Sequence, residues 1–327
     1  MKIGILFPGY GSQFVGMAKE LYDNSRTVQE YFEQASQCVD INFVKLCYAS
    51  SELEMNKISN AYTSIFLLGI SIAEMIVKSL NISFDLVAGY GSGEYSALCV
   101  SGGLNFADGL YLLKKLSHFY TAVRQELDVK TVVIDGLSVK DVKQICKEHS
   151  SENNTAQISV YSKDSENVVS GHTNAVDCVV EAAFFKGAEK ITFLDIEEAL
   201  HTPILKDMLE QLKLYLTKVD FIDLKIPMIS CVNGKEVVTG QAAKSVIMSQ
   251  VIKPIYWKHV LKKFNEMDII IVPSPSKILV EEIKLLYKDK IVIGIETLED
   301  IQNLKAILAN NQKSIDTQKI IENTLNS

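Results

Sequence analysis

The sequence predicts an α/β fold around a parallel sheet, and two observations support this prediction. Short, mostly apolar segments of strand length alternate along the chain with longer segments rich in helix formers, which is the order of β-α-β units. Residues Ile3–Phe7 form the first apolar run, which ends at Pro8 and Gly9, and Asp85–Ala88 form the next predicted strand. Apolar runs of this length are typical of strands buried inside a parallel sheet.

Helices are predicted between these strands and after them. Ala61–Leu80 is mostly apolar, and it is too apolar on all sides for a surface helix, so we expect it to pack against the sheet. The chain after the second strand predicts helices at Glu94–Val100 and Ala107–Val123. The pattern resumes later with a helix after His201, a strand near Ile226–Cys231, a helix near Ala242–Gln250 and a strand at Asp268–Val272.

The middle of the chain has a different order of elements. Between residues 128 and 196 the sequence predicts strand, helix, two strands, helix and strand, which is the βαββαβ order of a ferredoxin-like unit. We therefore expect a large domain at 1–127 and 197–310, an inserted ferredoxin-like subdomain at 128–196, and a polar, frayed tail at 311–327. The elements predicted for the insert are Thr131–Ile134, Val139–His149, Gln157–Tyr161, Asn167–Val169, Thr173–Lys186 and Lys190–Leu194, with a polar loop at Ser150–Ala156.

Composition and charge argue against several classes of protein. The chain has 327 residues, 47% of them hydrophobic, and a formal net charge of -7, so it has no surplus of Lys and Arg for the phosphates of a nucleic acid. Its six cysteines show no C-x-x-C spacing, so neither a zinc site nor a thioredoxin motif is predicted. The first apolar run is too short for a signal peptide, and no stretch approaches a membrane-spanning length. We expect a reduced, cytoplasmic protein that binds neither nucleic acid, membrane nor metal.

Residues 86–94, Leu-Val-Ala-Gly-Tyr-Gly-Ser-Gly-Glu, have the form of a strand-turn-helix site for a nucleophile. In the nucleophile elbow G-x-S-x-G, small residues on either side of the serine let a strand turn sharply into a helix. Gly89 and Gly93 are the flanking residues here, and Gly91 stands where the nucleophile belongs. The neighbouring hydroxyl, on Ser92, is displaced by one residue and should point elsewhere. The segment therefore predicts an α/β-hydrolase-like site without its nucleophile.

Four separate motifs resemble those of malonyl-CoA:acyl carrier protein transacylases. Phe7–Gln13 is similar to that family's F-P-G-Q-G-S-Q, and Val87–Leu98 to its V-A-G-H-S-L-G-E-Y-S-A-L, which carries the nucleophilic serine. Ala199–His201 stands where the family has A-F-H with its catalytic histidine, and Gln250–Trp257 matches Q-x-x-x-P-V-x-W. The motifs follow in family order and spacing from residue 1 to about residue 300. The chain is identified by this resemblance as a member of the family with a degenerate active site.

The resemblance implies an α/β-hydrolase-like acyltransferase domain with an inserted ferredoxin-like subdomain, acting in fatty acid or polyketide synthesis. Members transfer an acyl group from coenzyme A to the serine and then to the phosphopantetheine thiol of an acyl carrier protein, without a tightly bound cofactor. The resemblance also implies that His201 is the catalytic base, held by a backbone carbonyl of the Gln250 segment. The oxyanion hole would consist of the backbone amides of Tyr10 and Ser92.

Three departures from the family pattern fall at working positions. Gly91 has no oxygen to acylate, and Tyr10 replaces the glutamine of the first motif. An ungapped alignment of the helix after the elbow places Leu116 at the arginine that pairs with the malonyl carboxylate. Because leucine offers a buried carboxylate no charge, any acyl group bound here should be neutral. We expect a non-catalytic homologue, a pseudoenzyme, that binds an acyl carrier protein or a coenzyme A thioester. The predicted substrate-binding positions are Tyr10, Ser92, Leu116, Leu200 and Gln250.

Two catalytic alternatives remain open. His201 could activate water or an incoming thiol directly, which would make the chain a thioesterase or an acyltransferase without a covalent intermediate. Ser92 could serve as a displaced nucleophile if the helix began one residue late. In each case we expect Gly91 to keep the elbow conformation, with His201 and the two amides facing a cavity that holds water or an anion.

Three weaker patterns have simpler interpretations. Gly89–Gly91 after a strand resembles a dinucleotide-binding turn, but the third glycine position is Glu94. The acidic run at 195–198 fits a solvated loop better than a metal or acid/base cluster. Lys114 and Lys115 lie on the same helix as the arginine position, but successive helical residues project about 100° apart, so neither should reach that position.

Overall fold

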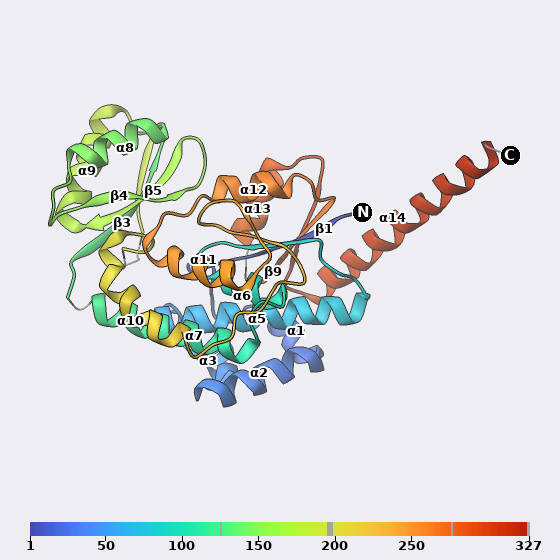
Figure 1. Cartoon of the computed structure of the whole chain (residues 1–327). Coiled ribbons are helices and arrows are strands. Elements are labelled where there is room, and N and C mark those ends of the chain that lie inside the picture. Colours follow the sequence, from blue (N-terminus) through green and yellow to red (C-terminus); the bar gives the residue numbers. More distant parts are fainter. Residues whose placement is uncertain (125, 195–198, 276, 326–327) are drawn as a thin grey trace.

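The computed structural model describes residues 1–124, 126–194, 199–275 and 277–325. Within these ranges the chain forms a large part around a mainly parallel sheet and a smaller part around an antiparallel sheet, both covered by helices (Figure 1). This arrangement confirms the predicted α/β fold with a ferredoxin-like insert.

The large sheet brings the ends of two strands to the same level, and the candidate site lies there. Phe7 at the end of β1 pairs with Gly89 at the end of β2. The loop after β1 and the turn after β2 therefore start side by side. The strand order among the described residues is β10 (Ile291–Ile295), β9 (Ile269–Pro273), β1 (Ile3–Phe7), β2 (Leu86–Gly89), β7 (Met228–Ile229) and β8 (Glu236–Val237), with parallel neighbours except for β7 and β8.

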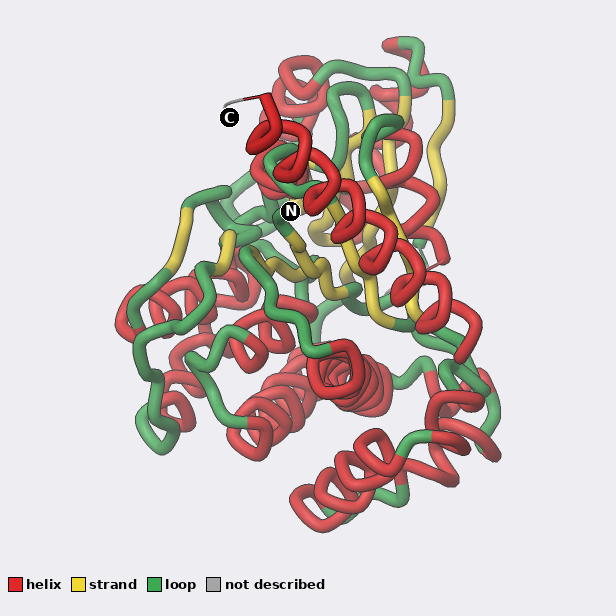
Figure 2. Tube along the Cα trace, turned by 90° about the vertical axis from the view of Figure 1, so that its right-hand side faces the viewer, coloured by secondary structure: helices red, strands yellow, loops and turns green. Residues whose placement is uncertain are grey.

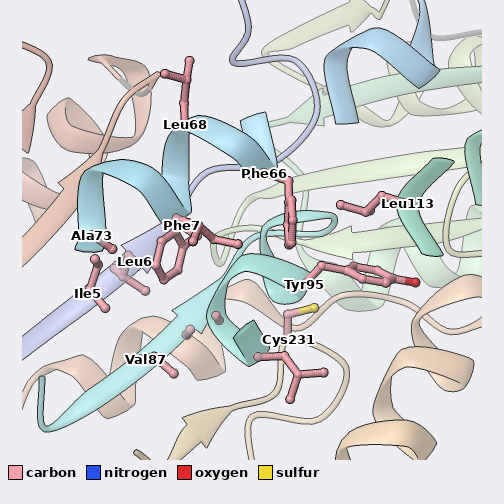
Figure 3. Close-up of a cluster of buried hydrophobic side chains, with 14 of the residues drawn as sticks. Ile5, Leu6, Phe7, Phe66, Leu68, Ala73, Val87, Tyr95, Leu113 and Cys231 are labelled. Atoms are coloured by element: carbon pink, nitrogen blue, oxygen red, sulfur yellow. The ribbon is translucent and has the colours of Figure 1, made fainter. Parts of the chain in front are cut away.

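Helix α5 (Ile58–Leu80) packs directly on the sheet. A Cβ at Gly69 on this helix would lie 3.1 Å from the ring of Phe7 on β1. Figure 3 shows Phe66 of α5 in the same cluster of buried side chains as Phe7 and Tyr95. The prediction that this all-round apolar segment is a core helix is confirmed.

The length of α5 corrects one expectation. Its 23 residues, with a mean hydropathy of 1.6, make it long and apolar enough to cross a membrane by length and composition alone. The expectation that no stretch approaches that length was wrong. Thr63, Ser64 and Ser71 interrupt the apolar run, but the mean hydropathy of the helix remains high enough for a membrane span. In the structure 72% of the apolar window is buried inside the protein, and these three hydroxyl residues are buried with it.

Helix α12 (Trp257–Phe264) covers the opposite face of β1. The Phe264 ring of α12 lies 2.7 Å from the place of the missing Cβ of Gly4, so any larger residue at position 4 would clash with it. Gly4 and Phe7 have opposite parity along the strand, and successive strand residues point to opposite faces. Helices α5 and α12 therefore enclose β1 from two sides.

Most elements that the sequence predicted are present, with ends shifted by up to three residues. The first strand and the helix at Thr173–Lys186 have the predicted bounds. The strand expected at Ile226–Cys231 is reduced to Met228–Ile229. The other predicted helices of the large part are α6 (Gly93–Val100), α7 (Phe106–Arg124), the short helix η1 (Pro203–Leu205) with α10 (Lys206–Leu216), and α11 (Gly240–Ile252).

Several elements were not predicted from the sequence, chiefly the short helices between β1 and α5. Their best local signals are the capping residues Ser25, Asn42 and Ser51, whose side chains each accept a hydrogen bond from a backbone amide in the first turn. The elements that the sequence did not predict are α1 (Lys19–Asn24), α2 (Arg26–Val39), α3 (Phe43–Ala49), α4 (Glu52–Met55), β8, α12, α13 (Lys277–Leu286), β10 and α14 (Leu298–Leu325).

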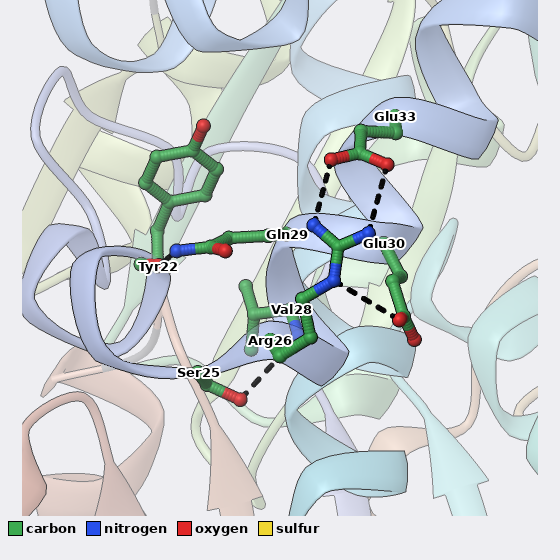
Figure 4. Close-up of polar contacts among 7 residues, drawn as sticks. All are labelled: Tyr22, Ser25, Arg26, Val28, Gln29, Glu30 and Glu33. Atoms are coloured by element: carbon green, nitrogen blue, oxygen red, sulfur yellow. Dashed lines mark hydrogen bonds and ion pairs between the residues drawn. The ribbon is translucent and has the colours of Figure 1, made fainter.

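Figure 4 shows how the start of α2 is held. The hydroxyl of Ser25 accepts a hydrogen bond from the amide of Val28 at 3.4 Å and caps the helix. On the exposed side, Arg26 reaches Glu30 at 3.1 Å and Glu33 at 3.0 Å. Exposed ion pairs contribute little to stability, so the cap and the buried apolar face of α2 determine its position.

The smaller part has the strand order of a ferredoxin-like unit. Its sheet runs β4-β5-β3-β6, with every pair antiparallel, and it has a core of its own that includes Val132, Val169 and Val176. The strand predicted at Asn167–Val169 is longer than predicted and runs from Glu166 to His172. The elements are β3 (Val129–Asp135), α8 (Val139–Glu148), β4 (Ala156–Tyr161), β5 (Glu166–His172), α9 (Thr173–Lys186) and β6 (Lys190–Phe193).

A short backbone ladder joins the two parts of the protein. The amide of Tyr161 on β4 donates to the carbonyl of Ile255 at 2.8 Å, and the amide of Ile255 donates to Ser159 O at 2.9 Å. Ile255 lies between α11 and α12 in the large part. The edge of the small sheet is therefore hydrogen-bonded to Ile255, whose side chain reaches the candidate site.

Helix α14 (Leu298–Leu325) leaves the body of the protein and projects outward (Figures 1 and 2). The sequence predicted frayed residues after Asn310, whereas the helix continues to Leu325. The polar residues of this segment include Gln, Lys and Glu, which are good helix formers.

Candidate active site

The turn after β2 has the backbone of a nucleophile elbow with glycine at its centre. Gly91 has φ of 54°, in the left-handed region that residues with side chains adopt rarely. The amide of Tyr90 donates to Phe7 O at 2.9 Å, and the amide of Glu94 donates to Gly91 O at 3.0 Å as α6 begins. The strand therefore turns directly into the helix, which is the conformation expected for this segment.

The flanking glycines are required because three pieces of backbone meet here. A Cβ at Gly89 would lie 2.0 Å from the carbonyl carbon of Gly93, and a Cβ at Gly93 would lie 2.5 Å from Phe7 O. A Cβ at Gly9 would lie 2.1 Å from Tyr90 O. No side chain fits at such distances, so the first loop, β2 and the start of α6 touch backbone to backbone.

The position at Gly91, in contrast, has room for a side chain. Within the described part of the chain, the atoms within 4 Å of a Cβ placed there are His201 Nε2 and Ile255 Cδ1, each at 3.6 Å. Both distances are ordinary van der Waals contacts. We refer to this space, bounded by Gly91, His201 and Ile255, as the nucleophile slot.

His201 Nε2 faces the slot, and hydrogen bonds hold both the ring and the backbone of this residue. Its Nδ1 lies 2.6 Å from Gln250 O, and since a carbonyl can only accept, Nδ1 carries the proton and Nε2 is the free acceptor. Its own carbonyl accepts a hydrogen bond from Gln157 of β4 at 3.3 Å. Burial lowers the pKa of His201 to about 4, although the Gln250 bond acts in the opposite direction. The imidazole is therefore neutral at pH 7 and can accept a proton from a group in the slot.

Gln250 connects His201 to the elbow, because its backbone contacts the histidine and its side chain contacts the elbow. Its backbone carbonyl holds His201, while its side-chain Nε2 donates to Gly91 O at 2.9 Å and to Glu94 Oε2 at 2.5 Å. Glu94, fully buried, also accepts from the amide of Cys231 at 2.8 Å. One residue therefore sets the position of the His201 imidazole relative to the slot.

The carboxyl group of Glu94 is the main buried charge of this network. Burial raises the pKa of Glu94 to about 7, although hydrogen bonds from Cys231, Ser230 and Gln250 act in the opposite direction. Glu94 lies within the elbow motif, and no role was predicted for it. An acidic residue in a segment that otherwise predicts a buried helix was the signal that could have identified it.

The two amides expected to form the oxyanion hole lie at the elbow, and one of them is engaged. The backbone amide of Tyr10 donates to the hydroxyl of Ser92 at 3.2 Å. The amide of Ser92 donates no hydrogen bond to any described residue. Gly91 has the left-handed φ of the elbow and Ser92 already has helical angles, so the turn into α6 is centred on Gly91.

The side chain of Tyr10 contacts residues outside the nucleophile slot. Its hydroxyl donates to Asn56 O at 3.1 Å, and its ring meets Tyr62 edge to face at 5.6 Å between centroids. Tyr62 in turn meets Tyr120 of α7 edge to face at 6.2 Å. Tyr10 therefore joins an aromatic cluster rather than supplying the polar group of the glutamine it replaces.

Leu116 and its neighbours provide no cation for an acyl carboxylate. Leu116 is 2% exposed and belongs to the main apolar core, while Leu200, next to His201, packs against the same core. Lys114 donates to the carbonyl of Val39. Lys115 lies over the ring of Tyr215, 5.1 Å from its centroid. The two lysines are thus engaged elsewhere, as the helical spacing predicted.

Metal binding has no support in the described part of the chain, where no group of three or more His, Cys, Asp or Glu side chains could hold an ion. The acidic run at 195–198 lies outside the described residues.

Comparison with known proteins places this architecture among the acyltransferases. The acyl transferase domain family matches residues 5–269. The chain belongs to that family, which confirms the resemblance drawn from the motifs.

The relatives share most of their length with this chain. The malonyl CoA-acyl carrier protein transacylase of Bacillus subtilis (strain 168) is 28% identical over 310 residues, covering 93% of this chain and 98% of the relative. The solved structure of the transacylase of the same name from Clostridium perfringens ATCC 13124 is 26% identical with a TM-score of 0.90, covering 97% of this chain and 100% of that one. A type II polyketide synthase acyl carrier protein in complex with its malonyl transacylase matches in fold, at 21% identity, a TM-score of 0.88, and 92% and 98% coverage.

Proposed function

We propose that this chain binds acyl thioesters of coenzyme A or of an acyl carrier protein in its acyltransferase site without forming an acyl-enzyme. The observation that carries the proposal is the nucleophile slot, where His201 Nε2 lies 3.6 Å from the place of a Cβ that Gly91 does not have. Two-step transfer requires an oxygen at this position to carry the acyl group. The chain retains the surroundings of the reaction and lacks the group that is acylated.

The proposed partner is an acyl carrier protein of fatty acid or polyketide synthesis. The relatives named above are transacylases whose names specify malonyl-CoA and acyl carrier protein, and one was solved together with its carrier protein. Because the chain folds like them over nearly its whole length, the phosphopantetheine thioester is proposed to enter the equivalent site.

The proposed ligand carries a neutral acyl group, such as acetyl or butyryl. Leu116, at the expected arginine position, is buried in the apolar core, and Lys114 and Lys115 are engaged elsewhere. A carboxylate in this surrounding would lose its water without gaining a partner.

Intact-protein mass spectrometry combined with calorimetric binding tests the proposal. Incubation of the purified chain with acetyl-CoA should give no mass adduct, while titration should show saturable binding of acetyl-CoA. Gly91→Ser is the matched variant, because it adds the missing oxygen at the slot. A stable acyl adduct on the unmodified chain would contradict the proposal, and so would a lack of binding.

A second candidate function is cleavage of the thioester by a nucleophile that is not part of the protein. The orientation of neutral His201 toward the slot favours it. His201 would take the proton of a water or thiol, the oxygen or sulfur would bond to the acyl carbon, and the leaving thiolate would take the proton from His201.

His201→Asn tests this second function, because asparagine tolerates the left-handed φ of 61° at this position but cannot act as the base. Release of free coenzyme A from acetyl-CoA, followed with a thiol reagent, should be slow in the unmodified chain and absent in His201→Asn. Equal release from both proteins would exclude His201 as the base, and no release from either would leave the binding function alone.

A further inference from the structure

We infer that the side chain of Ser92 occupies the oxyanion hole, so the chain carries a second substitution that weakens catalysis in addition to Gly91. The inference rests on the proposed function, because it takes the site to be that of an acyltransferase. It makes Ser92 a residue that blocks the hole, in place of the displaced nucleophile considered from the sequence.

The contact that carries the inference is unusual for a serine at the start of a helix. A serine that caps a helix usually has extended backbone angles, whereas Ser92 has helical φ and ψ of -58° and -21°. Its side chain makes no cap bond to α6. Its hydroxyl instead accepts the hydrogen bond of the Tyr10 amide at 3.2 Å. The side chain therefore contacts an amide that lies 82 residues away in the sequence.

Contacts of the surrounding loop fix the Tyr10 amide in its direction toward Ser92. The loop after β1 is closed by Ser12, whose hydroxyl donates to Gly9 O at 2.7 Å. The ring of Tyr10 is held by Tyr62 and by Asn56 O. Gly9 itself is in backbone contact with Tyr90. The amide cannot be turned toward a ligand without disturbing these contacts, so a ligand oxygen must replace the Ser92 hydroxyl.

The matching residue of the family motif V-A-G-H-S-L-G-E is leucine, which has no hydroxyl to offer the amide. A carbonyl oxygen bound in the hole of this chain has to compete with the Ser92 oxygen, which only a neutral hydrogen bond holds. One such bond corresponds to an equilibrium factor of about 2 to 12. Ser92 is also poorly placed as a nucleophile. Its own oxygen accepts the hydrogen bond of the Tyr10 amide, and that amide is the donor that would have to bind the carbonyl oxygen of the acyl group.

The experiment compares side chains at position 92 in the Gly91→Ser variant, which has an oxygen to acylate. The probe is p-nitrophenyl acetate, and the readout is the rate of the p-nitrophenolate burst. Adding Ser92→Leu or Ser92→Ala should raise this rate about 2- to 12-fold. Adding Ser92→Thr, which keeps a hydroxyl, should leave it close to that of Gly91→Ser alone. Equal rates for all four proteins would overturn the inference.

A second measurement needs no catalysis and uses the chain with glycine at position 91. Hydrogen exchange of the Tyr10 amide, followed by NMR, should be faster by a similar factor in Ser92→Ala than in the unmodified chain, and unchanged in Ser92→Thr. Unchanged exchange in Ser92→Ala would overturn the inference even if Gly91→Ser is not acylated. Neither measurement depends on acetyl-CoA binding, so failure of the proposed function is seen separately.

Discussion

His201 Nε2 lies 3.6 Å from the place that a Cβ atom would take at Gly91, while Nδ1 of the same ring is held by Gln250 O at 2.6 Å. A neutral imidazole with an unprotonated Nε2 thus faces a backbone position that has no functional group. Because buried hydrogen bonds hold both residues, their arrangement does not depend on the presence of a nucleophile.

Gly91→Ser should create a serine that is acylated by acetyl-CoA but hardly by malonyl-CoA. The new Cβ fits in the slot beside His201, but Leu116 still offers the malonyl carboxylate no charge. Mass spectrometry after incubation with each thioester checks this prediction. Gly91→Ala, which has the same backbone demand and no hydroxyl, is the control.

Adding Leu116→Arg to Gly91→Ser should shift acylation toward malonyl-CoA, with Leu116→Gln as the uncharged control. A Gly91→Ser protein that already prefers malonyl-CoA would show that Leu116 does not occupy the arginine position.

Gly91→Ala should lower the free energy of unfolding by about 1–2 kcal/mol, the usual cost of a left-handed conformation for a residue with a side chain. Gly16 is the comparison, because a Cβ there meets no atom within 4 Å and a Cβ at Gly91 makes only ordinary contacts at 3.6 Å, while φ at Gly16 is 97°, outside the left-handed well. Gly16→Ala should therefore be more destabilising than Gly91→Ala. Chemical denaturation of both variants measures the difference, and the reverse order would refute this explanation.

The stability of the chain should depend on the ionisation of Glu94. Its pKa of about 7 in the folded chain lies above the ordinary value of 4.5, so the folded state binds the proton more tightly than the unfolded state. Its contribution to stability is complete below pH 4.5 and is lost as the pH rises toward 7. His201 acts in the opposite sense, losing stability as the pH falls from 6.5 toward 4.

Glu94→Gln isolates the first of these two effects. The difference in unfolding free energy between this variant and the unmodified chain should shift in favour of the variant between pH 5 and pH 8. A difference that stays constant over this range would mean that Glu94 does not titrate there.

Ser25→Ala should destabilise the protein by about 1 kcal/mol, because it removes the acceptor for the Val28 amide at the start of α2. Arg26→Gln, which removes the neighbouring ion pairs on the exposed side, should change stability much less. Thermal unfolding of the two variants provides the comparison. A larger effect for Arg26→Gln would contradict the view that the cap holds this helix.

The strands and long helices of the fold could be predicted because their apolar periods are strong and local. Ile3–Phe7 is apolar throughout, and α5 is apolar on all sides. The short helices α1 to α4 could not be predicted in this way, because they depend on caps such as Ser25 and on packing against distant parts of the chain. The helical backbone of α14 was missed because polarity was taken as a sign of disorder.

The candidate site was predictable where motif residues have fixed partners in the backbone. The elbow at Gly91 and the His201–Gln250 contact are of this kind. The contact of Ser92 with Tyr10 joins two segments far apart in sequence, and no local pattern indicates it. The direction of the Tyr10 ring likewise depends on Tyr62, which no motif includes.

The ladder between Ile255 and β4 also has a mechanical consequence. Ile255 contributes one wall of the nucleophile slot, and its amide and carbonyl are both bonded to the edge of the small sheet. Gln157 of the same strand holds the backbone of His201. Rotation of the small subdomain as a rigid lid would break these bonds beside the slot, so the width of the slot is coupled to the orientation of the whole subdomain.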